Sequence, residues 1–277
     1  MGFARRARMV ARRPVRTSVR RWQARHPRLA VGDTGPPDFV GIGAQRCGTS
    51  WWHSLIEQHP RVAPLGWGVK ELHYFDDQWG GERRPAADYA AHFRRRAGFV
   101  SGEWTPRYLW DPWAVPALLE VAPAAKLLVV LRDPVARFRS GVRHAAKLSG
   151  EPTADDVSAA FGRGLYAEQL EPVLEAVGPQ QLLVLQFEQC VREPSRFLDQ
   201  TFEFLQLDPF RPAGKGERNE AVAPDVQISS TLTAAARRRY ADDAAGLAAL
   251  FPGAIDLDLW PGVSAQPGDP GLVQSGH

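Results

Sequence analysis

The sequence predicts an α/β protein in which helices cover both faces of a central parallel sheet, giving three layers. Two unbroken apolar runs, residues 126–131 (KLLVVL) and 182–186 (LLVLQ), are typical of parallel strands buried on both sides. The alternation of such runs with helical patterns favours a parallel sheet. The helical patterns cover about residues 134–148, 165–177, 194–206 and 231–250.

The first strand is expected over residues 38–43, directly after a Gly- and Pro-rich stretch that ends the N-terminal segment. A glycine-bearing loop follows it, and residues 49–58 then read as a helix that Pro60 stops. Residues 99–102 form a weaker strand candidate.

The composition limits the classes of protein to which the chain can belong. With 277 residues, 44% hydrophobic and 23% charged, the chain can bury one substantial core. It has no run of about 18 apolar residues, which argues against a spanning helix. Only Cys47 and Cys190 are present, which excludes a disulfide scaffold and a cysteine-rich zinc module and agrees with a cytoplasmic location.

Basic and acidic residues are distributed unevenly along the chain. Residues 1–28 contain ten arginines and no acid, which leaves 24 of the 34 basic side chains against all 31 acids, a net charge of −7. We expect a disordered basic arm over 1–35, a domain over 36–261 and a flexible tail over 262–277. The arm either keeps the chain soluble or docks at an anionic membrane surface or acidic partner. Because the basic charge is confined to it, nucleic acid is not an expected partner.

The loop GAQRCGTS, residues 43–50, has the composition of an anion-binding loop between a strand and a helix. Its glycines let backbone N–H groups face an anion, Thr49 and Ser50 add hydroxyls, and Arg46 adds a planar cation. A nucleotide P-loop would have lysine where Thr49 stands. A kinase would need that lysine and a magnesium site.

With Trp51, this loop resembles the 5′-phosphosulfate loop of sulfotransferases that use 3′-phosphoadenosine 5′-phosphosulfate (PAPS). The resemblance implies a P-loop-type nucleotide-binding fold, PAPS as co-substrate and no metal. It also implies that Arg46 stabilises the leaving phosphate. The loop residues it assigns to the nucleotide are Arg46, Cys47, Gly48, Thr49, Ser50 and Trp51.

A second block, residues 130–140 (VLRDPVARFRS), resembles the 3′-phosphate motif of the same family. The resemblance implies that Arg132 and Ser140 hold the 3′-phosphate of the nucleotide. A third, residues 70–76 (KELHYFD), is similar to a segment of glycan-modifying sulfotransferases such as the heparan sulfate 3-O type. It implies that Glu71 is the general base and that Lys70 or His73 orients the acceptor or neutralises the sulfuryl group.

Two further blocks resemble the family. Residues 102–108 (GEWTPRY) match it with Trp104 where some of the glycan enzymes have lysine, and residues 187–207 match a later stretch. The five blocks lie in family order over roughly residues 38–220. The implied activity is sulfuryl transfer to a hydroxyl, less readily an amine, of a carbohydrate or other small molecule.

Structural interpretations remain open beside these roles. Arg132 could pair with Asp133, Ser140 could be a mid-helix serine, and Glu71 could be a solvated partner of Lys70. His73 could be half-buried without a role in chemistry, and Cys47 lacks the partner that a nucleophile needs. Two other functions also remain: a P-loop kinase, and a non-catalytic nucleotide fold whose basic arm binds membrane or nucleic acid.

Overall fold

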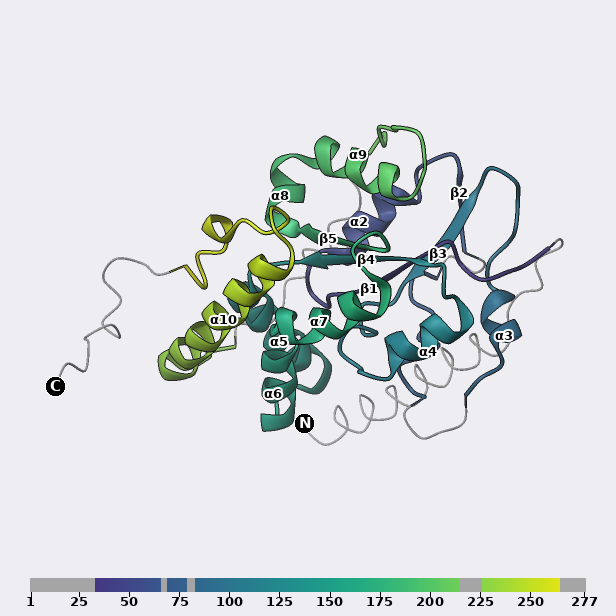
Figure 1. The fold of residues 1–277 in the computed structure, drawn as a ribbon. Helices are drawn as coiled ribbons and strands as arrows, with labels where there is room; N and C mark the ends of the chain where they lie inside the picture. Colours follow the sequence, from purple (N-terminus) through teal and green to yellow (C-terminus); the bar gives the residue numbers. More distant parts are fainter. Residues whose placement is uncertain (1–32, 66–68, 79–82, 215–225, 265–277) are drawn as a thin grey trace.

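The computed structural model describes residues 33–65, 69–78, 83–214 and 226–264, so most of the expected basic arm and tail lie outside it. Five parallel strands form one sheet in the order β2-β3-β1-β4-β5 (Figure 1). They are β1 (Phe39–Gly43), β2 (Val62–Ala63), β3 (Val100–Trp104), β4 (Lys126–Leu131) and β5 (Leu182–Gln186). The expected parallel sheet is therefore present, and both apolar runs are strands over the predicted residues.

Helices cover both faces of this sheet, with α2 and α9 on one side and α4 and α7 on the other (Figure 1). Helix α10 packs against α7 and α5, and α5 packs against α6. The helices with expected counterparts are α2 (Thr49–Ile56), α5 (Pro134–Ser149), α7 (Tyr166–Val177), α9 (Pro194–Phe204) and α10 (Ser230–Leu250). Those without are α3 (Ala86–Ala90), α4 (Ala114–Val121), α6 (Ala154–Gly162) and α8 (Phe187–Arg192). The three-layer α/β/α architecture is confirmed.

A glycine in the central strand allows β1 to lie close to its neighbour. A Cβ at Gly41 would fall 1.9 Å from the ring of Trp104, which is fully buried on β3. The indole cannot turn away without losing its hydrogen bond, because Nε1 donates to the Gly43 carbonyl at 3.1 Å. Trp104 is thus part of the core that supports the site.

The sheet topology creates a switch point beside β1. The chain leaves β1 toward β2 and β3 on one side and later enters β4 on the other. In open parallel sheets, ligands bind in the crevice outside the carboxyl ends of the strands at such a point. The predicted site residues lie in the segments that follow β1, β2 and β4, and hydrogen bonds from Lys70 to Thr49 and Ser50 and from Arg46 to Ser140 join these segments.

Candidate functional site

The loop after β1 brings the N-terminus of α2 to the carboxyl edge of the sheet. Gly48 adopts φ 82°, a left-handed conformation suited to glycine, and a Cβ there would lie 2.4 Å from the Phe187 ring. No side chain caps α2 at this residue. The first turn of α2 therefore offers its positive end to an anion.

Lys70 supplies the cation that the loop lacks at the position of Thr49. Its Nζ donates to Thr49 Oγ1 at 3.2 Å and to Ser50 Oγ at 3.1 Å, and it pairs with Glu71 Oε1 at 3.2 Å. A lysine from the segment after β2 thus reaches the start of α2. It joins the phosphosulfate-like loop and the predicted base in one cluster.

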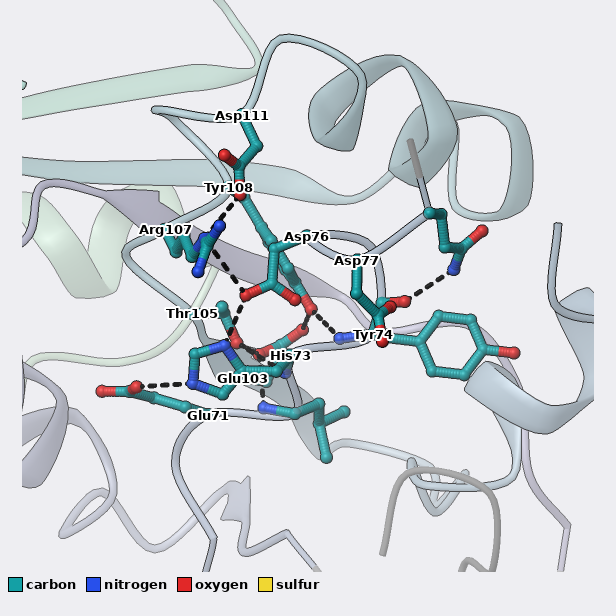
Figure 2. A network of polar contacts seen from close by, with 12 residues as sticks. Glu71, His73, Tyr74, Asp76, Asp77, Glu103, Thr105, Arg107, Tyr108 and Asp111 are labelled. Carbon is teal, nitrogen blue, oxygen red and sulfur yellow. Dashed lines mark hydrogen bonds and ion pairs between the residues drawn. The ribbon is translucent and has the colours of Figure 1, made fainter. Parts of the chain in front are cut away.

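Glu71, His73 and Asp76 form a chain of polar contacts (Figure 2). His73 Nε2 lies 3.1 Å from Glu71 Oε2, and its Nδ1 lies 2.6 Å from Asp76 Oδ2. Arg107 Nε lies 3.7 Å from the same Asp76 oxygen and donates to Asp111 Oδ2 at 2.7 Å. An imidazole between two carboxylates donates to both only when it carries both ring protons.

Electrostatics favour that charged imidazole. Burial alone would lower the pKa of His73, but hydrogen bonds and charges from Asp76 and Glu71 outweigh it and raise the pKa to about 9. Burial would raise the pKa of Glu71, but His73 and Lys70 outweigh it and lower the pKa to about 2. At neutral pH, Glu71 is therefore an ionised carboxylate and His73 a cation.

Cationic side chains gather between the loop and the start of α5. Arg46 Nε donates to Ser140 Oγ at 3.1 Å, which links the two predicted nucleotide motifs directly. The pKa of Arg46 is lowered by burial and by the charges of Arg132 and Arg137. Arg137 is 1% exposed, and its Nε and Nη1 have no hydrogen-bond partner among the described residues. A bound anion would relieve this mutual repulsion.

Among the described residues, the Arg132 guanidinium does not form an ion pair with the Asp133 carboxylate. Its guanidinium carbon lies 5.3 Å from the centre of the Phe187 ring. The Asp133 carboxylate instead caps α5, accepting from the amides of Val135 and Ala136 at 2.8 and 3.0 Å, and from the Gly262 amide at 2.7 Å. The alternative Arg132–Asp133 ion pair is therefore absent from the residues described.

Cys47 and Trp51 face the core from the loop. Burial raises the pKa of the Cys47 thiol to about 11, its Sγ lies 3.5 Å from the Tyr166 hydroxyl, and its amide donates to the Ala44 carbonyl. A thiol with that pKa is protonated at neutral pH and is no nucleophile. The Trp51 ring is buried and packs edge-on against Trp52 and Phe187.

Three contributors were not assigned roles from the sequence. Asp76 lies inside the KELHYFD block, three residues after His73. This short separation was the signal in the sequence for the contact between the two side chains. Arg137 lies inside the second block, where nothing in the sequence distinguishes a buried arginine from an exposed one. Glu103 is fully buried beneath the Lys70–Asp76 segment, although a lone glutamate directly after the strand candidate 99–102 would be expected on the surface.

Two features that other functions would need are absent from the described residues. No group of three or more His, Cys, Asp or Glu residues in the described part of the chain is placed to hold a metal ion. Over the same residues, no helix has the length and apolar character needed to cross a membrane.

Comparison with known proteins places the chain. The sulfotransferase family model matches residues 73–212, about half the chain, beginning just after Glu71. The membrane-associated sulfotransferase kil1 of Dictyostelium discoideum is 32% identical over 108 residues, 38% of this chain and 22% of that protein. The heparan sulfate glucosamine 3-O-sulfotransferase 6 of Mus musculus is 29% identical over 213 residues, 70% of this chain and 59% of that protein. The chain thus spans less than two thirds of either relative.

The fold has a counterpart among solved structures. A sulfotransferase from Alicyclobacillus acidocaldarius superposes with a TM-score of 0.62 at 24% identity, covering 82% of this chain and 99% of that one. This likeness concerns the fold alone. Together with the family match, it leads to one assignment: the chain belongs to the sulfotransferase family.

Proposed function

We propose that the protein transfers a sulfuryl group from PAPS to a hydroxyl group, with Glu71 as general base. The observation that carries this proposal is the position of Lys70, whose Nζ contacts Thr49 and Ser50 at the start of α2 and also Glu71. One ammonium group thus connects the end that would bind the donor with the end that would receive the acceptor proton. In-line transfer needs both ends in one fixed geometry.

The chemistry of the loop region fits the donor. PAPS supplies an activated sulfuryl group, and its departure leaves adenosine 3′,5′-bisphosphate. We assign the 5′ side to Arg46, Lys70 and the first turn of α2, because their charges act where negative charge develops on the leaving phosphate. The 3′-phosphate goes to Arg132 and Ser140, with the Ser140 hydroxyl exchanging its present partner Arg46 for the phosphate. Arg137, whose Nε and Nη1 have no partner in the described part of the chain, adds positive charge behind this site.

Glu71 is the base and His73 its orienting partner. Because His73 carries both protons at neutral pH, it cannot accept another, whereas the ionised Glu71 can. A carboxylate with a pKa of about 2 is a weak base. It therefore receives the proton late, as the acceptor oxygen bonds to sulfur and its own proton becomes acidic. His73, held by Asp76, fixes the Glu71 Oε2 oxygen.

The acceptor is a carbohydrate hydroxyl in this proposal. The printed names of relatives such as the heparan sulfate glucosamine 3-O-sulfotransferase 6 support that class. The residue after Glu103 points away from any acceptor, because Trp104 is fully buried and bonded to Gly43. Recognition of an anionic sugar chain would therefore use other side chains than one at this position.

The test is turnover with isotope-labelled PAPS over a panel of sugar and small-molecule alcohols, read as the gain of one SO₃ in mass. Glu71→Gln keeps the shape and loses the base, so turnover falls roughly 10²- to 10⁴-fold while affinity for adenosine 3′,5′-bisphosphate stays unchanged. Arg46→Ala weakens both turnover and nucleotide affinity, because its charge also acts before transfer. Near-normal turnover of Glu71→Gln would remove Glu71 from the mechanism. Binding of ATP in preference to PAPS would refute the donor.

A further inference from the structure

The segment that bears Glu71 and His73 is anchored through its backbone. Its three consecutive amides at positions 72–74 each donate to a side chain from the end of β3 or the turn after it. The Leu72 amide donates to Glu103 Oε2 at 3.2 Å, the His73 amide to Thr105 Oγ1 at 3.2 Å and the Tyr74 amide to the Tyr108 hydroxyl at 2.8 Å. Side chains therefore hold all three amides (Figure 2), and the Trp104 amide at the end of β3 also donates to the Lys70 carbonyl at 3.0 Å.

All of these anchors converge on one carboxylate. Thr105 Oγ1 donates to Glu103 Oε2 at 2.5 Å, and the Tyr108 hydroxyl donates to Glu103 Oε1 at 2.9 Å. A further hydroxyl, that of Tyr89 from α3, donates to Oε1 at 3.0 Å. Glu103 is fully buried, so no solvent competes for its oxygens. With the Leu72 amide, four donors point at it. They favour the ionised carboxylate, whereas burial disfavours it and raises the pKa of Glu103 to about 7.

The backbone of this anchored segment is also strained at His73. His73 adopts φ 51°, in the left-handed region that non-glycine residues rarely occupy. Such a conformation persists only where its surroundings over-determine it. The amides on either side of the His73 α-carbon, its own and that of Tyr74, are both held, and the hydroxyls that hold them owe their orientation to Glu103.

We propose that Glu103 is a positioning residue, whose buried carboxylate orients Thr105 and Tyr108 so that they fix the backbone carrying Glu71 and His73. This inference rests on the proposed function for its consequence in turnover, but its geometric content stands apart from it. The Glu71–His73–Asp76 contacts require His73 to keep its backbone conformation. Loss of the Glu103 network would let the imidazole leave its place between the two carboxylates.

Two tyrosines give a matched pair of variants for the test. Tyr89→Phe and Tyr108→Phe each remove one fully buried hydroxyl that donates to the same Glu103 oxygen, and both keep their ring contacts with Phe75. Only the Tyr108 hydroxyl also accepts from a segment amide within the described chain. Each deletion removes one donor to Glu103, and Tyr108→Phe also removes the acceptor of the Tyr74 amide. A role confined to core stability predicts no selective change in the titration of His73, whatever the loss of unfolding free energy in each variant.

The readout is the titration midpoint of the His73 imidazole, measured by NMR on the whole protein without donor or acceptor. The midpoint is expected to fall toward 6.5 in Tyr108→Phe and in Glu103→Gln, whose amide group can no longer accept at both positions. In Tyr89→Phe it stays at the wild-type value. Where a confirmed acceptor is available, Tyr108→Phe lowers kcat by about 10- to 100-fold at unchanged nucleotide affinity.

The possible results distinguish failure of the positioning role from failure of the proposed function. If Glu103→Gln does not fold, the tyrosine pair still gives the answer. A His73 midpoint that is unchanged in Tyr108→Phe, or that falls equally in both tyrosine variants, overturns the positioning role. A midpoint that falls only in Tyr108→Phe, in a protein without transferase activity, leaves the positioning role standing and refutes the proposed function instead.

Discussion

The charged state of His73 gives a prediction that needs no substrate. Replacing His73 by Gln keeps a hydrogen-bonding side chain between Glu71 and Asp76 but removes the titrating group. The pKa of His73 is raised from 6.5 to about 9 in the folded chain by the two carboxylates. A group whose pKa is raised by folding stabilises the protein fully below its unfolded value, and this contribution is lost as pH rises through the folded value. The relevant window is therefore pH 6.5 to 9.

The size of the effect follows from that interval. At about 1.4 kcal/mol for each pKa unit, it corresponds to about 3 kcal/mol of unfolding free energy. The His73 side chain keeps 19% exposure, so solvent screening reduces the expected value to about 2–3 kcal/mol. This is the contribution of the whole contact network and includes the effect of the same contacts on Glu71.

The assay is urea unfolding of both proteins at several values between pH 6 and 9.5. The difference in unfolding free energy between wild type and His73→Gln should shrink by about 2–3 kcal/mol across this range. Taking the difference cancels the titration of other groups, including Glu103, whose pKa burial raises to about 7. Parallel curves for the two proteins would refute the charged imidazole, and His73 would then become a candidate base.

Two further variants test the nucleotide site and the core. Arg132→Ala should cost about 1.5–3 kcal/mol of affinity for adenosine 3′,5′-bisphosphate, by calorimetry, because charge-assisted hydrogen bonds are lost. Affinity for the analogue without the 3′-phosphate should not change, and an equal loss for both would contradict the assignment. Gly41→Ala should lower the free energy of unfolding by about 1–3 kcal/mol, because its Cβ meets the Trp104 ring at 1.9 Å. Gly246→Ala, whose Cβ comes no nearer than 3.7 Å to a neighbour, is the control and should not be destabilised.

The sequence alone was sufficient for the architecture. Residues 126–131 and 182–186 are apolar throughout because strands of a covered parallel sheet bury both faces, and this pattern is local. Pro134 marked the start of α5 because its fixed φ suits a first helical turn. Helices α4 and α6 were not predicted, nor were the short elements β2, α3 and α8. Two to six residues carry too little periodicity to stand out, and only tertiary packing determines their state.

The order of motifs along the chain also predicted which residues would come together, since the loops after parallel strands meet at one edge of the sheet. What they do to one another depended on distances that no spacing encodes. Only the folded chain brings Lys70 to Thr49 and Ser50, and Arg46 to Ser140. Likewise, Glu103 resembles an ordinary surface acid in the sequence. In the folded chain Glu103 is completely buried and accepts from four donors. These donors come from separate segments that only the tertiary structure brings together.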